Sequence, residues 1–357
     1  MGERDSSLAS PPAGRKPCLA SRCTGAIWGS FIGDALAMPV HWYYNVAALR
    51  RDYGVVRDYL PPRNPHPDSY LGKALYHPVN AKAEVLHDQA KYWGQPGIHY
   101  HQLLRPGENT LNLKLAAELL ESLAEHGHYD ANDYLRRYLA FMLTPGRHRD
   151  TYVESAHRAF FQNYARGRDL FDAAIVNHDI GGLVALPGLI AGLASLGQNE
   201  AEIMAAVHQH LSLTHRGDEI ERAAQDLTEL LLHLLRGAEW NVEIRRLVHS
   251  RDLGLENLLD REDVAVVGGI FSAGCPVTGS FPAVLYLALK YFPNFEQALV
   301  ANTNLGGDNC HRGAVLGGIL GAVLGQKAIP DRWLIGLIAH DRLRQLINKL
   351  CQAPSGN

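Results

Sequence analysis

Apolar residues recur at intervals of three or four positions along most of the chain beyond about residue 23. The clearest series are Leu111, Leu115, Leu119, Leu123 and Leu227, Leu230, Leu231, Leu234. This spacing places the apolar side chains on one face of a helix, so it predicts amphipathic α-helices. The alternating pattern of strands is scarce, and Val264 to Val267 is the only short run that suggests one. We therefore predict an all-α fold.

One stretch, residues 50–110, interrupts the helical pattern. It contains scattered histidines and tyrosines together with Pro61, Pro62, Pro65, Pro67, Pro78, Pro96 and Pro106. A loop of this length within a domain is more often functional than a linker, so we predict a lid or a binding wall, with disorder as the alternative. Residues 1–20 are rich in Ser, Pro and Gly, which predicts a disordered tail. Residues 21–350 are then expected to form a single compact multi-helix domain.

Glycine shows the most informative periodicity. Two series recur every fourth residue, namely Gly25, Gly29, Gly33 and Gly313, Gly317, Gly321, Gly325. Each interior glycine costs a helix about 1 kcal/mol relative to alanine, so we expect the repeated cost to be offset by close backbone approach to another helix. Each series also borders a polar cluster, because Asp34 and His41 follow the first and Asp308 to Arg312 precede the second. Tight packing with no associated chemistry is the alternative.

Composition narrows the class of protein. A hydrophobic share of 46% in 357 residues is ample for a core. The net charge of -3, without a concentrated basic stripe, predicts no nucleic-acid partner. No apolar run approaches the roughly 18 residues of a membrane helix, so no membrane association is predicted. The five cysteines are odd in number and include no C-x-x-C pair, which argues against a disulfide framework and favours a reducing, cytoplasmic location.

The glycine series and their polar ends carry a family resemblance. Residues 304–308, running into residues 313–322, resemble the last signature of the ADP-ribosylglycohydrolases, in which a G-G-D-x-D-T run opens a glycine-rich helix. Residues 25–40 resemble the first signature of that family, and residues 213–215 resemble an internal T-H element. The three landmarks occur in the family's order and span roughly residues 23–340.

This resemblance implies an all-helical hydrolase that cleaves an ADP-ribosyl or related ribosyl-nucleotide glycosidic bond by metal-assisted attack of water. The implied partner is a small-molecule or ADP-ribosylated substrate, and the implied cofactor is a pair of Mg²⁺ ions with oxygen ligands. Carried over by position, the catalytic residues are Asp34, His41 and Asp308. The metal residues carried over in the same way are Asn109, Thr110, Asn112, Asp308 and Cys310.

The chain departs from the family at most of the magnesium ligands. The family's T-D-D-T segment falls within residues 108–112, which contain no two adjacent carboxylates. In the last signature Cys310 replaces the second Asp and His311 replaces the Thr, while His41 stands where the first signature leads to Glu. Losing charged ligands weakens magnesium binding, so we expect one ion or none. A zinc or iron site formed by His41, Asp308, Cys310 and His311 is an alternative, although Cys310 and His311 would point about 100° apart on a helix.

Further residues near these positions are candidates for substrate binding. They are Trp42, Tyr43, Tyr44, Gly306, Gly307, Asn309 and His311. The aromatic residues would stack on adenine and the helix start would hold a diphosphate, whereas core packing explains the aromatic residues equally well. Asp308 could equally be a plain helix N-cap, and His41 could be a general base or a structural histidine.

Two other segments are candidates for the wall of the cleft. Residues 149–154, followed by His157, and residues 177–179 combine carboxylates and histidines beside predicted helix starts. Capping by Asp150 or Asp179 is the alternative interpretation.

Three functions remain open from the sequence. The leading one is the hydrolase described above. The second is a non-catalytic nucleotide-binding or structural protein, because the jellyfish J-type crystallins are similar to this family and to residues 41–44 of this chain. The third is a divergent hydrolase that uses His41 as a base and Asp308 to orient water or a single ion. No leaving group and no oligomeric state are predicted.

Overall fold

Helices dominate the computed structural model, which describes residues 16–351. The α-helices are α1 (Leu19–Ala37), α2 (Val46–Tyr53), α3 (Leu111–His126), α4 (Ala131–Leu143), α5 (Ser155–Ala165), α6 (Leu186–Ser195), α7 (Glu200–Ser212), α8 (Asp218–Leu235), α9 (Trp240–Ser250), α10 (Asp263–Val266), α11 (Val277–Tyr291), α12 (Phe295–Asn304), α13 (Asn309–Leu324), α14 (Asp331–Gly336) and α15 (His340–Cys351). The 3₁₀-helices are η1 (Met38–Val40), η2 (Leu71–Lys73), η3 (Ala81–Ala83), η4 (His87–Tyr92), η5 (Leu170–Asp172), η6 (Ile180–Leu183), η7 (Leu255–Leu258) and η8 (Gln326–Ala328). The predicted all-α fold is confirmed.

Strands are limited to one short pair among the described residues. β1 (Ile175–Val176) and β2 (His215–Arg216) run parallel, with Ile175 opposite His215. The strand predicted at residues 264–267 is wrong, because α10 occupies most of this run. The periodicity of a short apolar run does not distinguish a strand from a short helix. Here the run forms the single helical turn of α10.

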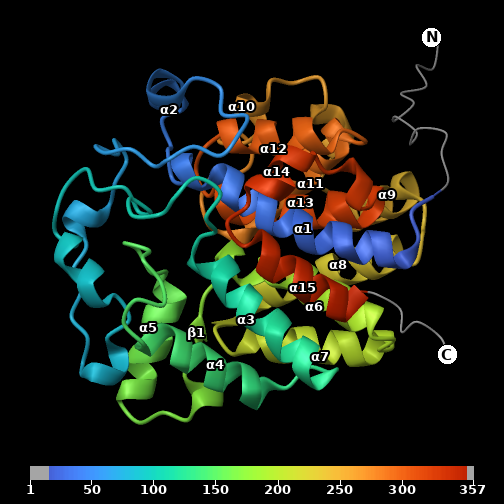
Figure 1. Cartoon of the computed structure of the whole chain (residues 1–357). Coiled ribbons are helices and arrows are strands. Elements are labelled where there is room, and N and C mark those ends of the chain that lie inside the picture. The colour runs from blue at the N-terminus through green and yellow to red at the C-terminus, as the bar shows by residue number, and fades with distance from the viewer. Residues whose placement is uncertain (1–15, 352–357) are drawn as a thin grey trace.

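Two helices from opposite ends of the chain run side by side through the centre of the molecule (Figure 1). A Cβ added to Gly29 of α1 would lie 2.0 Å from the carbonyl oxygen of Gly317 in α13, and one added to Gly33 would lie 2.0 Å from that of Gly313. The predicted close approach of the two glycine series is therefore confirmed, with each helix as the partner of the other. Gly325 lies just past the end of α13, where it adopts a positive φ of 75°.

Other helices surround this central pair. α6, α8, α11 and α12 contact it, and their apolar faces form one large buried cluster with α1 and α13. None of the described helices is long and apolar enough to cross a membrane.

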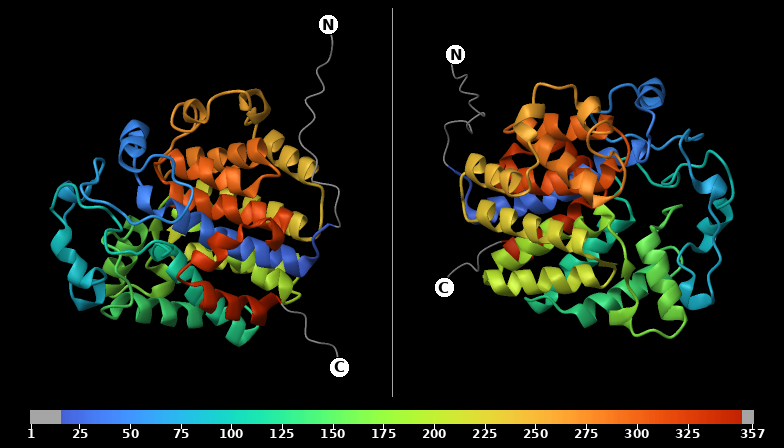
Figure 2. Two further views of the ribbon diagram at one scale, coloured as in Figure 1. Left: turned by 45° about the horizontal axis from the view of Figure 1, so that its top comes forward. Right: turned by 180° about the vertical axis from the view of Figure 1, so that it is seen from behind.

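The stretch predicted as a long loop, residues 50–110, covers the outside of the helical body (Figure 2). It contains the end of α2 and the three short turns η2, η3 and η4, and is otherwise irregular. Several of its side chains point inward, among them the buried His66, His99 and His101. The helix α1 begins at Leu19, within the range predicted as a tail, and residues 1–15 lie outside the described residues.

Candidate functional site

The glycines before α13 bring its first turn against two other segments. Gly306 and Gly307 both have a positive φ of 63°, which favours glycine. A Cβ on Gly306 would lie 2.0 Å from the Tyr43 carbonyl oxygen, and one on Gly307 would lie 2.1 Å from that of Ala273. Protein backbone therefore fills the space beside both glycines. The Asp308 N–H also donates to the Ala273 carbonyl, which fixes the start of the helix.

The segment after η1 is held to the same loop. The Trp42 N–H donates to the Gly307 carbonyl at 2.7 Å, and the Gly307 N–H donates to the Tyr43 carbonyl at 2.7 Å. Trp42 has a φ of 60°, an uncommon conformation for a residue with a side chain. Its ring stacks on that of His41 with the centroids 3.8 Å apart. These contacts direct His41 toward the start of α13.

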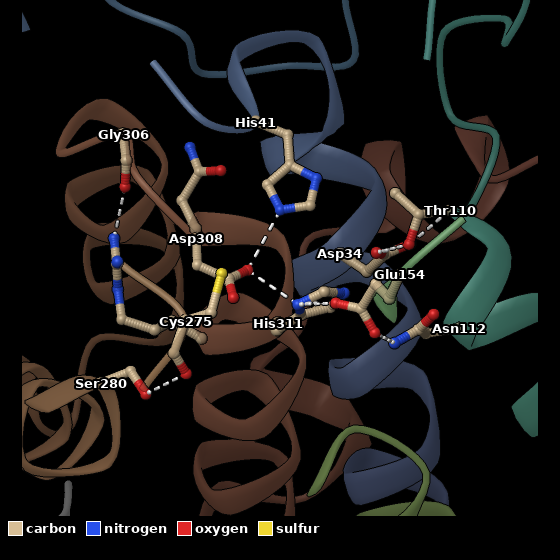
Figure 3. Close-up of polar contacts among 12 residues, drawn as sticks. Asp34, His41, Thr110, Asn112, Glu154, Cys275, Ser280, Gly306, Asp308 and His311 are labelled. Carbon is tan, nitrogen blue, oxygen red and sulfur yellow. Dashed lines mark hydrogen bonds and ion pairs between the residues drawn. The ribbon is translucent and has the colours of Figure 1, made fainter. Parts of the chain in front are cut away.

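His41, Asp308 and His311 meet at this point (Figure 3). His41 Nε2 lies 3.1 Å from Asp308 Oδ1, and His311 Nδ1 lies 2.8 Å from the same oxygen. All three side chains are buried. Asp308 occupies the N-cap position of α13, yet its side chain makes no capping hydrogen bond. The interpretation of Asp308 as a plain cap is therefore wrong, because its carboxylate faces the two imidazoles instead.

The pKa values of the three groups shift in different directions. Burial lowers the pKa of His41 to about 3, although its contact with Asp308 opposes this shift. Burial would also lower the pKa of His311, but the charges of Asp308 and Glu154 outweigh it and raise this pKa to about 10. Burial would raise the pKa of Asp308, but the two histidines hold it well below its usual value. Asp308 is therefore ionised at neutral pH.

Glu154 is the second carboxylate of the site. Its Oε1 atom lies 3.3 Å from His311 Nδ1, and its Oε2 atom accepts a hydrogen bond of 2.7 Å from the Asn112 side chain. Burial raises the pKa of Glu154, with a further contribution from the Asp308 charge and opposition from His311. Glu154 and Asp308 therefore face one imidazole nitrogen with pKa values displaced in opposite directions.

A chain of buried contacts extends from His41 to the far side of the site. His41 Nδ1 lies 2.8 Å from His101 Nε2, and His101 Nδ1 lies 3.2 Å from Asp150 Oδ1. Asp150 also accepts hydrogen bonds from the Leu111 N–H and from Lys114 Nζ. Asp150 thus accepts from the first N–H of α3 and does not cap α5, the helix that follows it in sequence, so the interpretation of Asp150 as a cap of that helix is wrong.

Asp34 is engaged with the protein and lies outside this cluster. Its carboxylate accepts hydrogen bonds from Asn109 Nδ2 at 2.8 Å, the Thr110 N–H at 2.9 Å and Thr110 Oγ1 at 2.6 Å. Burial raises the pKa of Asp34, although the hydrogen bonds from Thr110 and Asn109 oppose that shift. The predicted site residues Asp34, Asn109 and Thr110 are therefore brought together, but their polar groups hydrogen-bond to one another.

The remaining predicted residues are distributed around the site. Cys310 points into an apolar cluster with Ala37, Met38 and Leu104. Asn309 is buried and donates to the Thr303 and Val40 carbonyls.

Tyr43 is buried, and its hydroxyl donates to Asp52 at 3.3 Å. Trp42 packs against Tyr100 and Tyr152. Tyr44 is 52% exposed, so it is the one member of the aromatic trio with a large open surface.

A small cavity lies beside the site on the side of the predicted T-H element. It offers about 30 Å³ for the centres of water molecules, and Asn112, His157, Gly181 and His215 are among the residues that line it. This volume suffices for ordered water. The ring atoms His157 Nε2 and His215 Nε2 are buried without a hydrogen-bond partner among the described residues. Of the two further segments proposed as cleft walls, residues 149–154 contribute directly, through Asp150 and Glu154.

Sequence reasoning missed His101 and did not place Glu154 in the site. His101 lies in the irregular stretch, 60 residues from His41, and no helical or strand pattern indicates where its side chain points. Glu154 was named only as part of a possible cleft wall. The sequence signal for Glu154 is its position directly before a helix, α5, in a segment that also carries His157.

The donor set was tested against the magnesium ions that the family resemblance implies. Mg²⁺ requires near-octahedral oxygen ligands, commonly carboxylates and water. Asn109 and Thr110 donate to Asp34, and Asn112 donates to Glu154, so the segment that replaces T-D-D-T satisfies carboxylates of the protein. Around Asp308, the groups close enough to share an ion are the imidazoles of His41 and His311. This set does not fit two magnesium ions.

Known proteins resemble this chain over most of its length. The sequence model of the ADP-ribosylglycohydrolase family matches residues 15–357. An ADP-ribosyl-(dinitrogen reductase) glycohydrolase of Rhodospirillum rubrum is 26% identical over 279 residues, covering 74% of this chain and 87% of that protein. An uncharacterized protein of Archaeoglobus fulgidus is 26% identical over 338 residues, covering 91% of this chain and 94% of that protein.

The fold agrees with the sequence comparison. A chain from a solved ADP-ribosylglycohydrolase-related protein complex superimposes with a TM-score of 0.60 at 25% identity, covering 93% of this chain and 98% of that one. The match extends over the paired glycine helices and the polar groups at their ends, which are the landmarks of the resemblance seen in the sequence. This chain therefore belongs to the ADP-ribosylglycohydrolase family.

Proposed function

We propose that this protein is a hydrolase that cleaves an ADP-ribosyl, or related ribosyl-nucleotide, glycosidic bond. One observation carries the proposal: Glu154 and Asp308 face the same nitrogen of His311 with pKa values displaced in opposite directions. Glycosidases use a carboxylic acid that holds a proton and a second carboxylate that is ionised. Family membership and the glycohydrolase of Rhodospirillum rubrum support this class of reaction.

The residues present suggest roles for the two carboxylates. Glu154, whose pKa burial raises, is the carboxyl group suited to take up a proton and donate it to the leaving group as the bond to the anomeric carbon breaks. Asp308, which stays ionised, stabilises the positive charge that develops on the ribose and accepts a proton from the attacking water. Asn112 orients Glu154, and His41 orients Asp308. No step depends on a metal ion, and metal assistance by magnesium stays a prediction of the resemblance.

Substrate would approach from the side of the site that is open to solvent. Tyr44 is exposed there, and Cys275 and Asp179 are half-buried. Trp42 is enclosed by His41 and Tyr100, so we assign stacking on adenine to Tyr44 instead.

The test is release of free ADP-ribose from ADP-ribosylated arginine and serine peptides, with and without Mg²⁺. We expect release by the wild-type protein and at least a roughly 100-fold loss in the Asp308→Asn and Glu154→Gln variants. Glu118→Gln is a matched control, because Glu118 is a buried carboxylate of α3 that pairs with Arg147 and Arg342. No release under conditions in which the Rhodospirillum rubrum enzyme acts on its own substrate would favour the non-catalytic or crystallin-like alternative.

A further inference from the structure

Two nitrogen atoms and one oxygen atom converge at the first turn of α13. They are His41 Nε2, His311 Nδ1 and a carboxylate oxygen of Asp308, and all lie within 4.8 Å of one another. Metal–ligand bonds of about 2.0 Å in a tetrahedral site place neighbouring donor atoms about 3.3 Å apart. The two contacts to Asp308 Oδ1 measure 3.1 and 2.8 Å. These two contacts would have to lengthen by only a few tenths of an ångström to hold an ion, and the two imidazole nitrogens lie within 4.8 Å of each other.

The hydrogen bonds of the protein leave this group unsatisfied. Asp308 Oδ2 is buried without a hydrogen-bond partner among the described residues. His311 Nδ1 is close to Asp308 and Glu154, but it lacks the alignment of a hydrogen bond with either. In the described part of the chain, histidines alone form ion pairs with these two carboxylates. The unpartnered Oδ2 of Asp308 is available to a cation that takes the place of the imidazolium proton of His311.

The number of protons available to the chain of contacts also favours a cation beside Asp308. Three hydrogen-bond contacts run from Asp150 through His101 and His41 to Asp308. Each needs one proton, whereas two neutral imidazoles carry only two, so without an added cation one of the two rings would have to be an imidazolium. With a cation between His41 Nε2 and Asp308, both rings can be neutral. His41 Nδ1 then donates to His101, and His101 Nδ1 donates to Asp150.

We propose that His41, Asp308 and His311 bind one divalent transition-metal ion, such as Zn²⁺, in place of the magnesium pair. Two imidazoles and one carboxylate are ligands that zinc and its neighbours in the first transition series accept. The site keeps open positions for water or substrate. It rests on the donor geometry, so it stands whether or not the proposed hydrolase activity is found.

Neighbouring residues support this assignment of ligands. A metal-bound histidine commonly donates its other ring N–H to a partner that fixes its orientation, and His101 with Asp150 provides such a partner for His41. Glu154 lies beside His311 without belonging to the group of three. Cys310 points into an apolar cluster instead. The ligands proposed here are therefore three of the four residues suggested by the sequence, without the cysteine.

The experiment is metal binding by the full chain, freed of any affinity tag and stripped with a chelator. Titration with Zn²⁺ and with Co²⁺ should show one ion per chain by calorimetry. The Co²⁺ form should absorb in the visible with the bands of a nitrogen- and oxygen-ligated ion, and millimolar Mg²⁺ should not displace it. His41→Asn and His311→Asn should each abolish one-to-one binding. His101→Gln, which removes only the supporting partner, should weaken it about 10- to 100-fold.

His157→Asn is the matched control. His157 is a second buried histidine whose Nδ1 contacts the Tyr138 hydroxyl at 2.7 Å, and it lies outside the group of three. It should keep one ion per chain. Binding retained by folded His41→Asn and His311→Asn proteins, or no binding by folded wild type, would overturn the proposal. Neither result decides the hydrolase, because ADP-ribose release is measured separately.

Discussion

The Nε2 atom of His41 lies 3.1 Å from Oδ1 of Asp308, although 267 residues separate the two in sequence. Both residues sit at ends of the paired glycine helices, His41 just beyond α1 and η1 and Asp308 at the N-cap of α13. The distance between them therefore depends on how closely those two helices approach and on the backbone contacts of Trp42 and Tyr43 with Gly307. Substitutions that push the two helices apart should therefore change the distance between His41 and Asp308.

The helix pair can be tested by adding a single methyl group. Gly29→Ala would place a Cβ 2.0 Å from the Gly317 carbonyl oxygen, which is backbone and can move only if the helices separate. We expect the free energy of unfolding to fall by about 3 kcal/mol. Gly188→Ala in α6 is the control, since its nearest neighbours are Leu120 side-chain atoms at 3.5 Å or more. There we expect no loss, or a gain of up to about 1 kcal/mol in urea unfolding. Equal effects would refute close helix packing as the reason for the glycines.

The pH dependence of stability should report on His311 in the metal-free protein. Its pKa is raised in the folded state to about 10 from an unfolded value of about 6.5. The folded state therefore binds the proton more tightly, and the stabilisation is fully present below pH 6.5 and is lost as pH rises toward 10. Urea unfolding between pH 6 and pH 10 in the presence of a chelator should show this decline, and His311→Gln should flatten it. An unchanged slope in the variant would mean that another group titrates.

Asp34 should matter for stability and not for metal binding. Asp34→Asn keeps the shape of the side chain but replaces one carboxylate oxygen by an NH₂ group. One of the two hydrogen bonds donated by Thr110, from its N–H or from its hydroxyl, then loses its acceptor. We expect a loss of about 1–3 kcal/mol in the free energy of unfolding. Thr110→Val, which removes only the hydroxyl donor, should cost less. Loss of bound Zn²⁺ in a folded Asp34→Asn protein would instead show that Asp34 is a ligand.

Cys310 separates the two possible zinc sets. Because its side chain packs against Met38 and Leu104, Cys310→Ala should retain one Zn²⁺ per chain and lose about 1 kcal/mol of stability. Metal analysis of the purified variant after dialysis measures the first quantity, and thermal unfolding measures the second. If the folded Cys310→Ala variant bound no zinc, Cys310 would have to be a ligand.

The sequence predicted the parts of the fold that have a strict period. Glycines at every fourth position of a helix lie on one face and indicate that another backbone packs closely against that face. The contact of Gly29 with Gly317 is of this kind. The positions of Asp308 and His41 at the ends of the two series could be read in the same way. These features depend on local spacing, and local spacing is visible in the sequence.

Other parts of the site depend on tertiary contacts alone. His101 reaches His41 from an irregular stretch with no period that would indicate its direction. Capping by Asp308 was an acceptable local interpretation, but the two buried imidazoles provide stronger partners for the carboxylate. The sequence suggests Asn109 as a neutral metal ligand, but its side-chain amide donates to Asp34, 75 residues away.

The pairing of α1 with α13 has a consequence for the order in which the protein is made. A ribosome adds about 5–20 residues per second, so Asp308 leaves it roughly 13 to 53 s after His41. During that interval the glycine face of α1 has no partner, and α1 cannot take up its central position. The central helix pair can therefore form only after nearly all of the chain has been made. Chains that end before α13 should therefore not reach the folded state, because the glycine face of α1 would have no partner.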